Sequence, residues 1–113
     1  MKNNVEELIL DFDAMRVNAL KASRFLKVLA NPDRLLLLCQ LSQGEQCVSD
    51  LEKLVGIRQP TLSQQLTILR SEQLVNTRRE GKLIYYSIAS NEALAVMKLL
   101  YAQYCLPNEG EAT

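Results

Sequence analysis

A length of 113 residues corresponds to one domain whose modest core often gains stability by dimerisation. Hydrophobic residues make up 48% of the chain, no apolar run approaches the roughly 20 residues that span a membrane, and the acidic start lacks the basic region of a signal peptide, so we expect a cytoplasmic protein. The formal net charge is zero and histidine is absent, which excludes Ser-His catalysis and histidine-rich zinc sites, so we expect neither an enzyme nor a cofactor.

The first third of the chain is predicted to form two helices. Residues 5–29 carry apolar side chains at steps of three and four, the spacing of one helix face. The second helix, Pro32–Ser42, begins with Asn31 as a capping residue and Pro32 in its first turn. Because Leu35–Cys39 is apolar throughout, we expect this helix to be buried on most sides.

The middle of the chain is predicted to contain a short helix, a tight turn and a second helix. Val48–Val55 is the short helix, and Gly56 ends it. Pro60 lies in the first turn of the next helix, which runs to about Gln73. The apolar positions of this second helix recur at steps of four and three and predict its buried stripe, namely Leu62, Leu66 and Leu69.

A hairpin and a last helix complete the chain. Two runs with β-propensity, Leu74–Arg78 and Leu83–Ile88, flank a turn at Glu80-Gly81-Lys82. Asn91–Leu106 is predicted to be helical, and residues 107–113 a flexible tail. The order of elements predicts a mainly α fold with a small β-hairpin, a winged helix-turn-helix, in which residues 1–106 form a single domain.

The second middle helix and the hairpin carry side chains suited to duplex DNA. Ser, Thr and Gln on an outward helix face offer hydrogen bonds to base edges, and basic residues of a hairpin suit phosphates or a minor groove. Residues 58–82 hold five basic against two acidic side chains, a net charge of +3. The alternative is an ordinary solvated surface or a protein-binding module. The predicted DNA-binding residues are Gln59, Thr61, Ser63, Gln64, Gln65, Thr67, Arg70, Arg78, Arg79 and Lys82.

Three stretches of the chain resemble the ArsR/SmtB family of winged-helix repressors. They are LKVLANPDRLLLL (26–38), VSDLEKLVGIRQPTLSQQLTILRSEQLV (48–75) and TRREGKLIYYSI (77–88). The resemblance implies a homodimer built on the first and last helices, which binds double-stranded operator DNA until an inducer is sensed. The chain departs from the family at Arg58, where many members have a capping Ser, so the cap falls to Gln59 or to the backbone.

The cysteines bear on what such a repressor would sense. Cys39, Cys47 and Cys105 are an odd set without a C-x-x-C pair, which is not the pattern of a disulfide framework or a structural zinc site. Arsenic sensors of the family carry Cys-Val-Cys where this chain has Cys47-Val48-Ser49, so one thiol of that pattern is missing. We therefore predict no metal site and interpret Cys47 as incidental.

Cys39 and Cys105 resemble the dithiol of the persulfide-responsive BigR/SqrR-type branch of this family. The resemblance implies that reactive sulfur species link the two thiols and so relieve operator binding, with Cys105 attacking and Cys39 resolving. From the residues alone, Cys39 is better explained as a small buried apolar side chain. The alternatives are a sensor of a thiophilic metal, a metalloid or peroxide, and a HlyU-like activator that displaces a nucleoid protein.

Overall fold

The computed structural model describes residues 12–105, and the chain divides into two compact units between Ala30 and Asn31. In the first unit, helix α2 spans Phe12–Leu29. Residues 5–11 of the predicted first helix and the predicted tail at 107–113 lie outside the described residues.

Helix α2 exposes most of its large apolar side chains. Met15, Leu20 and Leu26 are 41%, 70% and 57% exposed, and Phe12 and Val17 are exposed as well. The predicted steps of three and four place Phe12, Met15 and Leu26 on one stripe of this 18-residue helix. A helix with an exposed apolar stripe gains stability when another surface covers that stripe.

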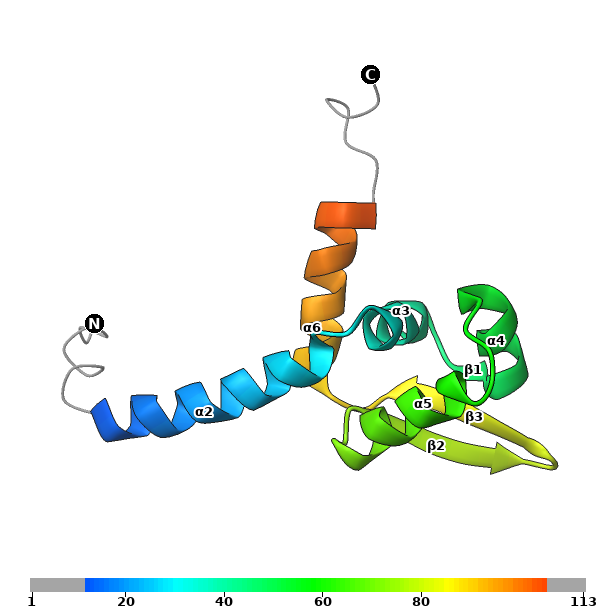
Figure 1. Cartoon of the computed structure of the whole chain (residues 1–113), viewed down its shortest axis with the longest axis horizontal. Helices are drawn as coiled ribbons and strands as arrows, with labels where there is room; N and C mark the ends of the chain where they lie inside the picture. Colours follow the sequence, from blue (N-terminus) through cyan, green and yellow to red (C-terminus); the bar gives the residue numbers. More distant parts are fainter. Residues whose placement is uncertain (1–11, 106–113) are drawn as a thin grey trace, which may run out of the picture. The chain divides into compact units, whose positions relative to one another are not determined.

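The second unit is built in the predicted order of helix, helix, helix, hairpin and helix (Figure 1). Its helices lie close to the predicted ranges, and the predicted cap of α3 is confirmed, because Asn31 Oδ1 accepts a hydrogen bond from the Arg34 amide at 3.0 Å. The last predicted helix is α-helical only to Leu100 and then continues as a π-helical turn, η1. The elements are α3 (Pro32–Leu41), β1 (Gln46–Cys47), α4 (Val48–Val55), α5 (Thr61–Ser71), β2 (Val75–Glu80), β3 (Leu83–Ile88), α6 (Asn91–Leu100) and η1 (Tyr101–Cys105).

The sheet has one strand more than the predicted hairpin. Strands β2 and β3 pair antiparallel from Val75↔Ile88 to Glu80↔Leu83, and β1 adds to the other side of β3. Two residues are too few to show the alternation by which a strand is identified in a sequence. Strand β2 also runs two residues beyond the predicted Arg78. The hairpin of β2 and β3, which we call the wing, is therefore longer than expected and projects beyond the helices of the second unit (Figure 1).

Helix α5 ends two residues before the predicted Gln73. Gln73 itself adopts a left-handed conformation, with φ of 63°. The next amide, that of Leu74, then bonds back to the Leu69 carbonyl at 2.9 Å, as in a Schellman motif. The chain therefore leaves the helix abruptly and enters β2.

The core of the second unit lies beneath α5 and between the helices. The predicted stripe of α5 is confirmed, since Leu62, Leu66 and Leu69 are all at most 2% exposed. Leu37 and Leu38 of α3, Leu51 of α4 and Met97 of α6 are also fully buried. Among the described residues no polar or charged side chain is buried. In the part of the chain that the structure describes, we find no helix with the length and apolarity needed to cross a membrane.

Candidate nucleic-acid interface and thiol pocket

Helix α5 presents a polar outer face opposite its buried leucines. Helix α4 precedes it and ends at Gly56, whose amide donates a hydrogen bond to the Glu52 carbonyl. The φ of 72° at Gly56 is a left-handed conformation that few residues other than glycine adopt. Of the predicted base-contacting positions, Ser63, Gln64, Thr67 and Arg70 are exposed. The arrangement of α4, turn and α5 is that of a helix-turn-helix with α5 as the second, reading helix.

Gln59 caps α5 from just outside the helix. Its Oε1 accepts hydrogen bonds from the Ser63 backbone amide, at 3.1 Å, and from the Ser63 hydroxyl. Of the two expected sources of the cap, Gln59 or the backbone, Gln59 supplies this contact from the residue before the N-cap Pro60. The contact satisfies an amide of the first turn that would otherwise lack a partner. The Thr67 hydroxyl donates to the Ser63 carbonyl at 2.8 Å. The hydroxyl hydrogens of Ser63 and Thr67 are thus used in contacts with nearby residues of the chain.

Gln64 and Gln65 are neighbours with different surroundings. Gln65 is half-buried, and its Oε1 accepts a hydrogen bond from Arg34 Nη1 of α3 at 2.8 Å. This amide oxygen thus joins two helices of the fold, and the predicted contact of Gln65 with DNA stays a prediction. Gln64 is exposed, and no side chain in the described residues takes its amide. Neither Arg34 nor its pairing with Gln65 was identified from the sequence, since 31 residues separate them.

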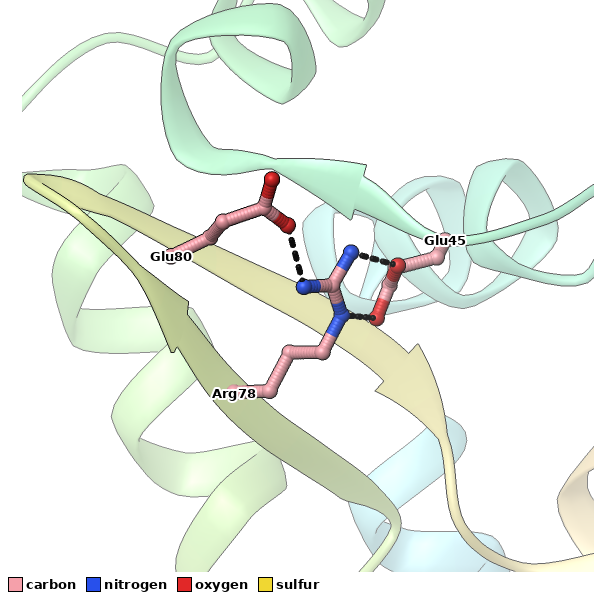
Figure 2. A network of polar contacts seen from close by, with 3 residues as sticks. All are labelled: Glu45, Arg78 and Glu80. Carbon is pink, nitrogen blue, oxygen red and sulfur yellow. Dashed lines mark hydrogen bonds and ion pairs between the residues drawn. The ribbon is translucent and has the colours of Figure 1, made fainter.

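The wing holds one of its arginines in a network of acidic side chains. Arg78 Nε and Nη2 donate to the two carboxylate oxygens of Glu45, each at 2.7 Å, and Nη1 donates to Glu80 at 2.6 Å (Figure 2). The guanidinium carbon also lies 4.4 Å from the centre of the Tyr85 ring. Hydrogen bonding to Arg78 holds the pKa of Glu45 below its ordinary value.

This network bears on the predicted role of Arg78 as a phosphate contact, which stays a prediction. Two carboxylates already compensate its charge, and its fork is bidentate on Glu45, which immediately precedes β1. Arg79 and Lys82 are exposed, and within the described residues neither forms an ion pair. The sequence offered no signal for Glu45, because it lies 33 residues from Arg78.

The two predicted sensor cysteines line the same apolar pocket. Cys39 of α3 is half-buried, Cys105 at the end of η1 is exposed, and both thiols are free. They share the wall of a cavity of about 520 Å³. Burial raises the pKa of Cys39, and the nearby charge of Cys105 and a hydrogen bond between the two side chains raise it further. The two thiols therefore line one pocket, and each is part of the surroundings of the other.

Cys47 lies elsewhere and serves the fold. It is 5% exposed, belongs to β1, and places its sulfur 3.3 Å from the Ser49 hydroxyl. It does not line the pocket of the other two cysteines. Among residues 12–105 there is no group of three or more His, Cys, Asp or Glu side chains that is arranged to hold a metal ion.

Known proteins that are similar to this chain in sequence and structure are bacterial gene regulators. The model of the family "Bacterial regulatory protein, arsR family" matches residues 31–77. The biofilm growth-associated repressor of Agrobacterium fabrum is 49% identical over 96 residues, which cover 85% of this chain and 82% of the relative.

Solved structures of such regulators superpose closely on this chain. The BigR repressor of Xylella fastidiosa has a TM-score of 0.76 at 42% identity, covering 82% of this chain and 92% of BigR. Reduced HlyU of Vibrio cholerae, a transcriptional activator, has a TM-score of 0.79 at 40% identity, covering 82% of this chain and 98% of HlyU. A homodimeric winged helix-turn-helix domain from Mycobacterium bovis has a TM-score of 0.66 at 34% identity, covering 82% and 84% of the two chains.

The comparisons indicate the same fold as the outward face of α5 and the projecting wing. The predicted winged helix-turn-helix fold and the likeness to BigR are both confirmed. The chain belongs to the arsR family of winged-helix, DNA-binding transcriptional regulators.

Proposed function

We propose that this protein is a cytoplasmic, homodimeric repressor whose operator binding is relieved when reactive sulfur species oxidise Cys39 and Cys105. The observation that carries the proposal is the shared pocket of these two free thiols in a chain whose α5 and wing face outward. The similarity to the biofilm growth-associated repressor supports repression as the output. The protein acts by binding and has no catalytic role.

DNA binding uses the outer face of α5 and the free basic residues of the wing. Gln64 reads base edges in the major groove, since its amide is exposed and offers both a donor and an acceptor. Arg79 and Lys82 contact phosphates, which adds affinity and salt dependence more than sequence choice. Thr61, Ser63, Thr67 and Arg70 complete the surface that faces the duplex.

The dimer is built on the terminal helices. Helix α2 exposes Met15, Leu20 and Leu26, and α6 exposes Leu99 by 59%. Apolar area of this extent is covered in a stable protein, and the homodimeric neighbour from Mycobacterium bovis supports a second copy as the cover. Two-fold symmetry then presents the two α5 helices to half-sites about one DNA turn, roughly 34–36 Å, apart.

The thiol switch begins at Cys105. This thiol is exposed, whereas burial and the neighbouring sulfur raise the pKa of Cys39, which makes Cys39 the poorer initial nucleophile. The Cys105 thiolate takes a sulfur atom from a persulfide, RSSH, and releases the thiol RSH. Cys39 then attacks Sγ of the Cys105 persulfide and expels hydrogen sulfide, which leaves a Cys39–Cys105 link.

Helix α3 carries the effect of this link toward DNA. This helix contains both Cys39 and, more than one turn earlier, Arg34. The Arg34 guanidinium donates a hydrogen bond to Gln65 of α5 at 2.8 Å. A link that ties η1 to α3 therefore acts on an element with a direct polar contact to the reading helix. A small shift of α5 in each protomer changes the distance between the two α5 helices on the operator.

The proposal is tested with reduced full-length protein and an operator obtained by selection from random duplexes. Treatment with a low-molecular-weight persulfide should change the intact mass and lower operator affinity at least about tenfold. Cys105→Ser should abolish both responses and keep the affinity of the reduced protein, while Cys47→Ser should keep both responses. An unchanged mass, or an affinity that ignores the modification, would refute the sulfur switch.

A second candidate output has support from HlyU, the transcriptional activator that is 38% identical to this chain over 100 residues. Such a protein raises expression by displacing a nucleoid protein from the promoter. Transcription measured in vitro on naked DNA separates the two, because a repressor lowers transcription there and a displacing activator leaves it unchanged.

A further inference from the structure

We propose that the pocket at Cys39 and Cys105 selects neutral, apolar polysulfides, such as short dialkyl trisulfides, over anionic ones such as glutathione trisulfide. This inference rests on the proposed sensing role of the two thiols and names the class of reagent that reaches them. It assigns the pocket wall a function of its own, that of a selectivity filter in front of the reactive sulfur.

The wall of the pocket is apolar on every element that forms it. Leu35 and Leu36 come from α3, Leu100 comes from α6, and Tyr101 and Tyr104 come from η1. Among the described residues that line the cavity, none carries a charged side chain. A volume of about 520 Å³ lies in the range that holds a small organic molecule and exceeds what a single sulfide ion needs.

The pocket is open to solvent beside the attacking thiol. Cys105 is exposed, and two neighbours of the cavity, Leu36 and Tyr104, are 50% and 82% exposed. A reagent therefore arrives from water and leaves part of its hydration shell as it enters. This desolvation is costly for a carboxylate without a partner and favourable for an alkyl chain, at about fourfold in affinity per buried methylene group.

The reaction of a neutral trisulfide with the pair balances without a further oxidant. The Cys105 thiolate attacks a terminal sulfur of R–S–S–S–R, forming Cys105–S–S–R and releasing the persulfide RSS⁻, which takes up a proton. The Cys39 thiolate then attacks Cys105 Sγ, forming the Cys39–Cys105 disulfide and releasing RS⁻, which is protonated to RSH. The two thiols lose two electrons, and the trisulfide gains them.

The chemistry separates recognition from reactivity. Both classes of trisulfide contain the same sulfur chain, so the difference between them on the protein arises from their substituents. The alkyl groups contact leucine and tyrosine side chains, whereas glutathione brings carboxylates to a wall without a counter-charge.

The test compares rates of modification of reduced full-length protein by dipropyl trisulfide and by glutathione trisulfide, followed by intact mass. The same two reagents react with N-acetylcysteine to give the intrinsic ratio of their rates. We expect the protein to favour the dipropyl reagent at least about tenfold more than N-acetylcysteine does. A ratio equal to that of N-acetylcysteine would overturn the selectivity and leave the sensing role standing. Absence of modification by either reagent would overturn both.

Matched variants locate the selectivity in the pocket. Leu36→Lys places a cation at the wall and should lower the preference at least threefold, as should Tyr104→Lys, at the more exposed position. Leu54→Lys is the control, because Leu54 is 55% exposed on α4 and does not line the pocket. Equal effects of all three variants, each with the circular dichroism spectrum of the native protein, would show that the wall has no such role.

Discussion

Arg78 and Arg79 are adjacent in the chain, yet their surroundings give them different tasks. The Arg78 guanidinium is bidentate on Glu45, bonds to Glu80 and stacks on Tyr85, so it joins the wing to the segment that precedes β1. Arg79 is exposed and, among the described residues, forms no ion pair. At the residue scale, the charge available for DNA is therefore that of Arg79, which has no carboxylate partner among the described residues.

Replacing each arginine by alanine should separate these tasks. Arg79→Ala removes one phosphate contact, so the slope of log affinity against log salt should become less steep by about 1. Arg78→Ala should leave this slope unchanged within error, because no counterion is released from a guanidinium that is already paired. Fluorescence anisotropy with a labelled operator at a series of salt concentrations measures both slopes. Equal changes in the two variants would contradict the assignment.

At the scale of elements, the reading helix is delimited at both ends by polar residues that a propensity argument passes over. Gln59 caps its start from outside the helix, and Gln73 ends it in a left-handed conformation with φ of 63°. A residue with a Cβ atom is disfavoured there by roughly 1–2 kcal/mol, whereas glycine is not. The hydrogen bond from the Leu74 amide to the Leu69 carbonyl requires this left-handed conformation at Gln73.

Gln73→Gly should therefore stabilise the protein by about 1 kcal/mol. The gain is reduced by the larger backbone entropy of glycine in the unfolded chain. Gln73→Ala is the matched control, since it removes the polar side chain and keeps the Cβ atom, and it should give no stabilisation. Urea unfolding followed by circular dichroism reports both free energies. A stability for the glycine variant at or below that of the alanine variant would argue against the conformational explanation.

At the scale of the whole molecule, the question is what covers α2. Its exposed apolar stripe has the three-and-four spacing of a helix that packs along its length. A chain of this size with so much apolar surface on one helix gains a core by association, which the proposed homodimer supplies. DNA binding then depends on the dimer, because two reading helices engage one operator.

Leu26→Glu should convert the protein to a monomer. Sedimentation equilibrium should give about twice 12.8 kDa for the native protein and about 12.8 kDa for the variant. Operator affinity should fall more than about tenfold in the same variant, because one reading head replaces two. Lys21→Glu adds negative charge to α2 away from the stripe and should keep both mass and affinity. A monomeric native protein would refute the dimer.

Much of the fold follows from periodicity in the sequence. The buried leucines of α5 recur at steps of four and three, and Val48–Val55 coincides with α4 residue for residue. The sequence did not predict β1, because two residues carry no pattern. It extended the last α-helix beyond Leu100, because apolar positions continue at helical spacing through Tyr101 and Tyr104 of η1. Local patterns thus identify elements reliably where an element is long enough to repeat.

The candidate site was less accessible to the sequence. The sequence predicted both Gln64 and Gln65 as DNA contacts. Only the packing of α3 on α5 shows that Gln64 faces solvent and that Gln65 bonds to Arg34. The sequence likewise predicted both Arg78 and Arg79, and only the fold shows that Arg78 is paired with Glu45. The pairing of Cys39 with Cys105 came from a family resemblance, because 65 intervening residues carry no spacing signal.

The winged helix-turn-helix follows from the sequence, since hydrophobic spacing, caps and turn residues act within a few positions of the chain. The polar groups that remain available on its surface are set by the packing of the folded chain. That choice depends on side chains brought together from distant positions, as Glu45 is to Arg78, Arg34 to Gln65 and Cys39 to Cys105. Hydrogen bonds and ion pairs act over a few ångströms in space, so no local pattern in the chain encodes them.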